Sequence, residues 1–241
     1  MKNIFFVIIL LIPIAVSCQT TDTLNYKKSK FGFVFSPDYC YRILTYNTSY
    51  IPVEDLRRTE EVPAFGFTAG LNFRKGLTPK IIFVTGIYYS VMGAQTKNIE
   101  LKWATPGINF PVTSKTRYLY KYLDIPVKIN YLFGPGRVNY FISCGVSVNI
   151  FSEKKTKLIS AYTSGHTTSV SSAVDLGFLK FNLATLIGLG IKYDITKRLS
   201  IACEPVYRQF INSIEADKSI KEHPYSIGIN VEMIYRFKQK K

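Results

Sequence analysis

After residue 16 the chain has no run of about 18 consecutive apolar residues, the length that a membrane-spanning helix requires. Histidine is rare, with only His166 and His223, and no pair of cysteine or histidine residues has the spacing of a metal site. The glycine-containing segment 188–194 lacks the arrangement that cradles a phosphate. The sequence therefore argues against a helical membrane protein, and we expect no metal, no cofactor and no catalytic residue.

Acidic residues are also few, with 16 aspartates and glutamates against 31 lysines and arginines and a formal net charge of +15. Such a charge suggests nucleic acid as a partner. However, no segment gathers the basic residues with interleaved aromatic residues, and the N-terminal pattern described next predicts export, after which a protein seldom meets nucleic acid. We therefore expect no nucleic-acid partner, and we expect anionic lipid headgroups to be the counterpart of this charge.

The N-terminus has a basic start, an apolar run over 4–16 and small residues after it, which is the pattern of a secretory signal peptide. We expect a signal peptide over 1–18 and an N-terminal periplasmic segment over 19–29. The sequence Ala-Val-Ser-Cys loosely resembles a lipoprotein signal, so lipidation of Cys18 stays open. Among the other cysteines, two fall on apolar strand faces, as small hydrophobic residues do; the three are Cys40, Cys144 and Cys203.

Apolar residues alternate with polar or small ones along eight stretches of the chain, and no helical pattern of comparable length competes with them. The stretch 181–193 alone exceeds the ~9–11 residues that cross a bilayer as a tilted strand. Strands of soluble sandwiches average only ~5–6 residues. We expect strands over 30–43, 63–75, 80–95, 116–133, 138–152, 179–194, 199–214 and 225–237.

The connections between these strands alternate in length. Tight turns with glycine, proline or basic residues lie at 76–79, 134–137 and 195–198, while longer polar segments cover 44–62, 96–115, 153–178 and 215–224. Short periplasmic turns and longer extracellular loops are typical of outer-membrane barrels, and aromatic residues near the strand ends suit the membrane interfaces. Basic residues such as Arg137 and Lys197 gather at the turn end, which we expect to face the periplasm and its anionic headgroups.

The fold that we predict is all-β: an eight-stranded antiparallel transmembrane β-barrel over 30–237, followed by a basic tail at 238–241. Closure is needed because an open sheet edge in hydrocarbon would leave backbone groups unpaired. Two prolines inside strands, Pro126 and Pro205, predict a bulge or a local distortion.

The polar faces of these strands would fill a lumen that eight strands leave just wide enough for side chains. We predict that opposite charges pair there and plug the barrel; the residues of this lumen charge network are Asp124, Lys128, Lys192, Glu204, Arg208, Glu232 and Arg236. On the last two strands we predict that Arg208 lies opposite Glu232 and that Glu204 lies opposite Arg236.

Three segments carry a family resemblance: YLDIPVKINY at 122–131, GLGIKYDITKRLSIACEPVYRQFINSI at 188–214 and YSIGINVEMIYRF at 225–237. They resemble the PorT-like outer-membrane β-barrel family of Bacteroidota, and the resemblance covers the chain from about Lys30 to Phe237. It implies an eight-stranded barrel and, in the namesake branch, a role in type IX secretion and gliding. The chain departs from many outer-membrane barrels by continuing past Phe237, where they often end on an aromatic residue.

We therefore expect a non-enzymatic protein of the outer membrane with a structural or interaction role in the cell envelope, and the resemblance adds a link to type IX secretion. The expected partners are outer-membrane lipids, lipopolysaccharide and other envelope or secretion-system proteins. Two alternatives stay open. A lipid A-modifying enzyme would need a serine, a histidine and a carboxylate at the outer rim, and Ser164 and Ser169 flank His166 in a polar segment. A secreted lipocalin-like binder would turn the apolar faces inward, which the strand lengths disfavour.

Overall fold

The computed structural model describes residues 29–46, 57, 59–103, 110–134, 136–173, 177–216 and 220–237. The predicted signal peptide, nearly all of the predicted periplasmic segment and the predicted basic tail lie outside these residues. The described residues form one sheet of ten β-strands. The strands are β1 (Lys30–Tyr46), β2 (Glu61–Gly76), β3 (Ile81–Thr96), β4 (Ile99–Glu100), β5 (Pro111–Phe133), β6 (Val138–Tyr162), β7 (Thr167–Ala173), β8 (Phe181–Asp194), β9 (Leu199–Phe210) and β10 (Ile220–Tyr235).

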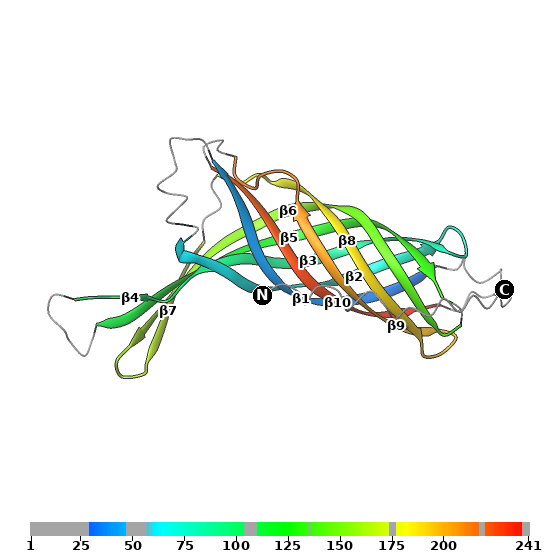
Figure 1. Ribbon diagram of the computed structural model, residues 1–241, viewed down its shortest axis with the longest axis horizontal. Helices are drawn as coiled ribbons and strands as arrows, with labels where there is room; N and C mark the ends of the chain where they lie inside the picture. The colour runs from blue at the N-terminus through cyan, green and yellow to red at the C-terminus, as the bar shows by residue number, and fades with distance from the viewer. Residues whose placement is uncertain are drawn as a thin grey trace, which may run out of the picture.

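Eight of these strands close into a barrel (Figure 1). Going around the ring, the order is β1, β2, β3, β5, β6, β8, β9, β10 and back to β1, and every neighbouring pair is antiparallel. The predicted fold class, an all-β eight-stranded antiparallel barrel, is confirmed. The turn between β5 and β6 contains Gly134 and Gly136 at φ values of 104° and 88°, a conformation that favours glycine because it lacks a Cβ atom.

Side chains alternate along the barrel strands, with apolar ones on the outside, where a membrane would meet them, and polar or small ones on the inside. On β8, Phe181, Ile187 and Leu189 are about 60% exposed on the outside, while Asn182 and Ala184 between them are buried inside. Aromatic rings meet near both ends of the outer surface, with Phe31 against Phe73 at one end and Tyr39 against Phe65 at the other. The inward-facing apolar arrangement of a lipocalin-like binder is therefore not the one found. No helix in the described residues is long and apolar enough to cross a membrane.

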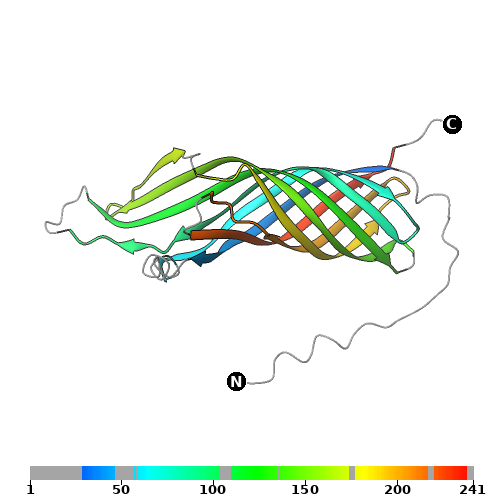
Figure 2. The same ribbon diagram turned by 90° about the horizontal axis from the view of Figure 1, so that it is seen from above.

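Strands β5 and β6 continue far beyond the barrel, and this corrects the predicted loops over 96–115 and 153–178 (Figure 2). The extension of β5 pairs with β4, and that of β6 pairs with β7. In Figure 1 both short strands lie to the left of the barrel. These segments were missed because both faces of the extension are largely polar, so the apolar alternation that marks the barrel strands fades there.

The two prolines distort the sheet without shifting it. The β3–β5 ladder is interrupted beside Pro126, the β8–β9 ladder is interrupted beside Pro205, and the register is the same on either side of each gap. The absent proline N–H explains each gap, because it cannot donate to the neighbouring strand. The shifts in register lie elsewhere, and one of them, between Lys121 and Tyr122 in the β5–β6 ladder, lies close to Ile150, where β6 stops pairing with β8.

Candidate functional site

The centre of the lumen is organised around the buried carboxylate of Glu204 on β9. Lys128 of β5 donates to it through its Nζ atom at 2.9 Å, and Asn230 of β10 donates through Nδ2 at 2.8 Å. The hydroxyl of Ser143 on β6 donates a further hydrogen bond to the same group. Donors from three strands thus compensate one carboxylate across the barrel, as a buried charge requires.

A second centre surrounds Asp38 of β1. Arg208 of β9 donates to its carboxylate at 2.6 Å, and the hydroxyls of Ser36 and Thr68 donate at 2.7 and 2.6 Å. The Nη2 atom of Arg208 also donates to Asn230 at 2.6 Å, which joins this centre to the one around Glu204. The lumen charges therefore form a connected network between strands that are far apart in the sequence.

The predicted pairing between the last two strands is wrong. Glu232 lies opposite Ala202, six residues along β9 from Arg208, and it pairs instead with Arg74 of β2. Arg208 lies opposite Ser226, and Glu204 lies opposite Asn230 rather than Arg236. The predicted faces are correct, since Glu204, Arg208 and Glu232 all point inward. The error arose because inward side chains also pair with the next strand but one, here β10 with β2 and β9 with β1, and the order of the strands along the chain does not reveal such partners.

The other predicted lumen residues have different surroundings. Asp124 is buried and accepts a hydrogen bond from Asn149 at 2.6 Å. Lys192 lies near the turn end, with its Nζ atom 3.1 Å from Asp194. Arg236 follows β10 and is half-buried. The seven residues are thus spread along the lumen and do not converge on one binding site.

Apolar clusters close the lumen on both sides of these charges. One buried cluster lies toward the end at which β5 and β6 extend beyond the barrel; its residues are Cys40, Met92, Tyr120, Tyr122, Ala184, Phe210 and Ile214. The other lies toward the end with the tight turns; its residues are Phe141, Ala202 and Ile234. The rings of Tyr122 and Phe210 lie 5.2 Å apart across the lumen. A cavity between the clusters has a volume of about 20 Å³, which is room for about one water molecule. The described side chains therefore leave a plugged barrel.

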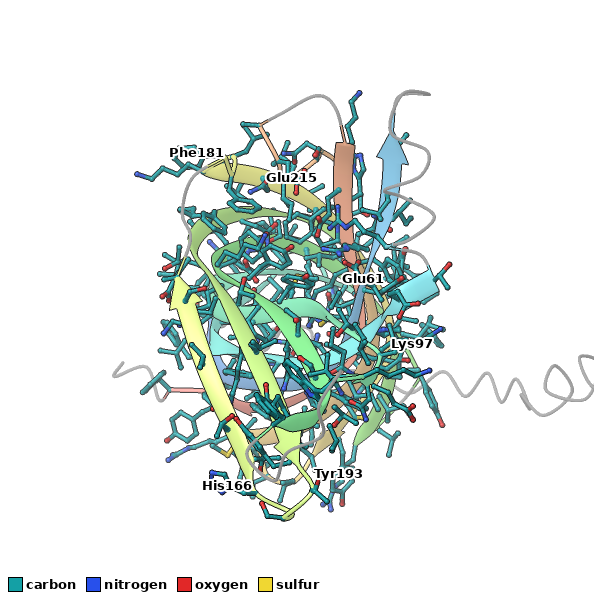
Figure 3. The ribbon with its side chains drawn as sticks, turned by 90° about the vertical axis from the view of Figure 1, so that its left-hand side faces the viewer. Glu61, Lys97, His166, Phe181, Tyr193 and Glu215 are labelled. Atoms are coloured by element: carbon teal, nitrogen blue, oxygen red, sulfur yellow. The ribbon has the colours of Figure 1, made fainter. Side chains whose placement is uncertain are left out.

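An ion cluster that the sequence did not reveal lies at the end of the barrel where β5 and β6 extend, and Figure 3 labels one of its members, Glu61. Arg42 at the end of β1 pairs with Glu61 and, at 2.7 Å, with Glu222, while Arg57 lies 3.3 and 3.2 Å from the same two carboxylates. The hydroxyl of Tyr120 donates to Glu222 at 3.0 Å. The predicted loops include Arg57, Glu61 and Glu222. Arg42, however, continues the inward alternation of β1, and this alternation was the available signal that a charge faces the lumen there.

Lys154 joins this cluster to the extension of β6. Its ammonium lies 4.8 Å from the ring centre of Phe178, 5.4 Å from that of Tyr120 and 5.6 Å from that of Tyr118, at cation–π distances. Burial lowers the pKa of Lys154 below its ordinary value. Lys154 therefore packs on the aromatic rings at this end of the lumen, next to the residues where β6 extends beyond the barrel.

We define the projecting sheet as β4, β7, residues 111–121 of β5 and residues 152–162 of β6. Its inward face carries Leu158 and Val170, which lie opposite each other and are 42% and 67% exposed. Its outward face carries mostly lysine, arginine, serine and threonine side chains. At its margins β7 pairs with β6 and β4 pairs with β5, so within the described residues each has one paired edge and one open edge. An open edge and two accessible faces suit contact with another molecule.

The residues considered for a lipid A-modifying enzyme lie at the tip of the projecting sheet. His166 occupies the turn between β6 and β7 (Figure 3), and its ring lies 6.1 Å from that of Tyr162. His166, Ser164 and Ser169 are all exposed. An exposed turn does not hold a serine, a histidine and a carboxylate in the fixed relation that nucleophilic catalysis requires. Among the described residues, no three histidine, cysteine or acidic side chains are grouped to hold a metal ion.

A closed ring of long strands, an apolar outer band and a charged, plugged interior together define an outer-membrane β-barrel protein. The chain matches the family described as outer membrane protein beta-barrel domain over residues 30–214, and it belongs to that family. The family match establishes an outer-membrane barrel in general, and membership of the PorT-like branch stays a prediction.

Among solved structures, the chain is similar to Neisserial surface protein A, with a TM-score of 0.41 and 12% identity over 87% of this chain and 97% of that one. It is similar to Ail, the attachment invasion locus protein of Yersinia pestis, with a TM-score of 0.32 and 12% identity over 86% and 98% of the two chains. The outer membrane protease OmpT from Escherichia coli gives a TM-score of 0.42 and 8% identity over 91% and 99%. No curated protein matches the chain.

Proposed function

We propose that this protein is a sealed, non-enzymatic barrel of the outer membrane that presents its projecting sheet at the cell surface, where the sheet contacts other components of the envelope. The observation that carries the proposal is the combination of a plugged lumen with a sheet that continues two barrel strands outward. A plugged barrel of eight strands offers little to transport. The surface that remains for function is the one that extends beyond the membrane.

The length of the connections supports this orientation. The turns 77–80 and 195–198 are tight, and outer-membrane barrels place such turns in the periplasm and their long connections outside. The projecting sheet belongs to the long connections, so this rule assigns it to the cell surface. The exposed lysine and arginine side chains near the tight turns suit the anionic headgroups of the inner leaflet.

The resemblance to the PorT-like family favours a link to type IX secretion as the process that this interaction serves. Deletion of the gene in its own host would then leave cargo proteins in the periplasm, and the full chain would restore their export. Restoration by a chain that lacks the projecting sheet would contradict a role for that sheet in secretion. Normal export in the deletion strain would contradict the link itself.

Ion conductance tests the sealed barrel directly. We expect the purified chain to give no steady single-channel current in a planar bilayer, because two apolar clusters and a charge network block the lumen. A variant in which short Gly-Ser turns replace residues 99–114 and 156–172 tests the sheet. It should migrate as a folded barrel on an unheated gel but lose the cross-links that the intact chain forms with envelope components in living cells. A steady current from the intact chain, or unchanged cross-links in the shortened one, would contradict the proposal.

A further inference from the structure

The outward face of the projecting sheet begins with a column of cations on β5. In the barrel, Leu123 is the last exposed apolar residue on the outside of this strand. The following residues on the same face are Lys121, Leu119, Arg117 and Lys115, so three of the four carry a positive charge. The apolar band of the barrel is therefore succeeded directly by basic side chains.

Strand β6 adds two further cations beside this column. Lys155 lies opposite Leu119, and Lys157 lies directly opposite Arg117. Two like charges that face each other across a ladder repel and destabilise the pair. Both side chains are half-buried, which reduces the screening of this repulsion by water. An anion bound between them would convert the repulsion into two attractive contacts.

The carboxylates on this face leave positive charge uncompensated. Glu153 lies 2.6 Å from Lys121 and 3.5 Å from Lys155, and Glu100 lies opposite Thr113 at the far edge. Five cations on the face therefore meet two carboxylates, and the carboxylate of Glu153 is on the membrane side of the Arg117–Lys157 row. The excess charge is concentrated at that row.

Arg117 also reaches back toward the membrane surface. Its Nη2 atom donates to the backbone carbonyl of Phe65 on β2, across β3. The ring of Phe65 is 70% exposed and lies 5.5 Å from the ring of Tyr39, in the aromatic girdle at this end of the barrel. Aromatic girdles lie at the level of the lipid headgroups. This hydrogen bond therefore holds the guanidinium of Arg117 just above that level.

The height of the cations fits the headgroup region of the outer leaflet. At ~3.3 Å per residue, Arg117 lies roughly 20 Å beyond Leu123 along β5, and a strand tilt of ~40° reduces this to roughly 15 Å above the apolar band. The same estimate places Lys121 roughly 5 Å above the band. The column thus spans the layer in which a glycolipid carries its phosphate groups and its inner sugars.

Strand β7 supplies hydroxyl groups at the same heights. Ser171 lies opposite Lys157 and Ser169 lies opposite Ile159, so both are on the outward face beside the cations. Both serines are exposed. Cations with neighbouring hydroxyl donors are suited to phosphate oxygens and sugar hydroxyls.

We infer that the outward face around Arg117, Lys155 and Lys157 binds the phosphorylated saccharide headgroup of a glycolipid in the surrounding outer leaflet, the chemistry of lipopolysaccharide. The inference deepens the proposed function, because it rests on the projecting sheet lying at the cell surface. The Arg117–Lys157 row holds the phosphate, and the serine hydroxyls of β7 contact the sugars. Bound glycolipid in turn stabilises the projecting sheet by removing the repulsion between its two strands.

The test measures binding of purified short-core lipopolysaccharide to the full chain, refolded in a neutral detergent. We expect the triple variant Arg117→Gln, Lys155→Gln, Lys157→Gln to bind at least about tenfold more weakly, since each cation near an anionic surface contributes several-fold. The matched control removes one arginine and two lysines, all exposed, from the turn end: Lys75→Gln, Lys80→Gln, Arg137→Gln. The control should stay within about twofold of the intact chain, and heat-modifiable gel migration checks that both variants fold.

Two further probes identify the ligand chemistry. Lipopolysaccharide from which the phosphate groups have been removed should bind to the intact chain at least about tenfold more weakly, and heparin, a soluble polyanion, should not displace the phosphorylated form. Equal losses of affinity in the two triple variants would show that the binding is general charge attraction, and they would overturn the inference. Equal affinity for lipopolysaccharide with and without its phosphate groups, or displacement of lipopolysaccharide by heparin, would also overturn the inference. These measurements in detergent do not depend on orientation, so their failure is distinct from a failure of the proposed surface display.

Discussion

Replacing Glu204 by glutamine is the sharpest perturbation of the lumen network. The change keeps the shape of the side chain and removes its charge, while Lys128 remains 2.9 Å away with almost no exposure to water. The amide keeps one of the two oxygens, so Asn230 can still donate to it, and the hydroxyl of Ser143 can turn to accept from the new NH2 group. The dominant effect is therefore an ammonium left in the lumen without its counter-charge.

The burial of the pair sets the magnitude. The exposed fractions of the side chains are 3% for Lys128 and 0% for Glu204. Removing one partner of a buried ion pair costs ~3–5 kcal/mol, because the other charge remains uncompensated. The double variant Glu204→Gln, Lys128→Gln places two neutral amides in the same space, so it should recover about 2 kcal/mol relative to the sum of the single variants.

The assay is urea unfolding in detergent or lipid vesicles, followed by the gel mobility of the folded barrel. The control is a second Lys–Glu pair in the same chain, Lys121 with Glu153, which lies at 2.6 Å but is 21% and 26% exposed. Water screens such an exposed pair, so Lys121→Gln should change the free energy of unfolding far less than Glu204→Gln does. Strictly additive effects of the two changes at Glu204 and Lys128, or equal costs for both pairs, would refute the reasoning.

Two further sets of substitutions test the register of the strands and the packing of the lumen. Glu232→Gln and Arg74→Gln should be non-additive in urea unfolding, whereas Glu232→Gln and Arg208→Gln should add, because Glu232 pairs with Arg74 on the other side of β1. Coupling to Arg208 and none to Arg74 would show that the β9–β10 register is wrong. Gly190→Ala should destabilise the barrel by ~1–3 kcal/mol, because a Cβ atom there overlaps the ring of Phe141. Phe141→Leu should reduce that penalty in the same unfolding assay, and an unchanged penalty would argue against the overlap.

The barrel itself could be predicted from the sequence because two independent patterns agree. A strand that separates lipid from a polar lumen must alternate, and β8 does so over its whole length, with the outward residues from Phe181 to Tyr193 apolar or threonine. The tight turns contain the glycine, proline and basic residues that reverse the chain in a few positions. The predicted strand ends at these turns lie within about two residues of the observed ones.

The projecting sheet and the ion pairs could not be predicted in the same way. Beyond the membrane both faces of β5 and β6 meet water, so residues such as Thr116 and Lys157 carry no signal that separates a strand from a polar loop. Partners such as Arg74 and Glu232 come from strands distant in the sequence. The face of each charged residue follows from parity, but its partner depends on the register of several strands at once.

The display of the projecting sheet at the cell surface is tested most directly by cysteine labelling in intact cells. Alanine replaces all four native cysteines, namely Cys18, the buried Cys40 and the lipid-facing Cys144 and Cys203, and a single cysteine is then placed at His166 or at Arg137. An impermeant thiol reagent should label the His166→Cys chain in intact cells, and it should label the Arg137→Cys chain only after the outer membrane has been opened. Labelling at Arg137 in intact cells with protection at His166 would place the projecting sheet in the periplasm and contradict the account.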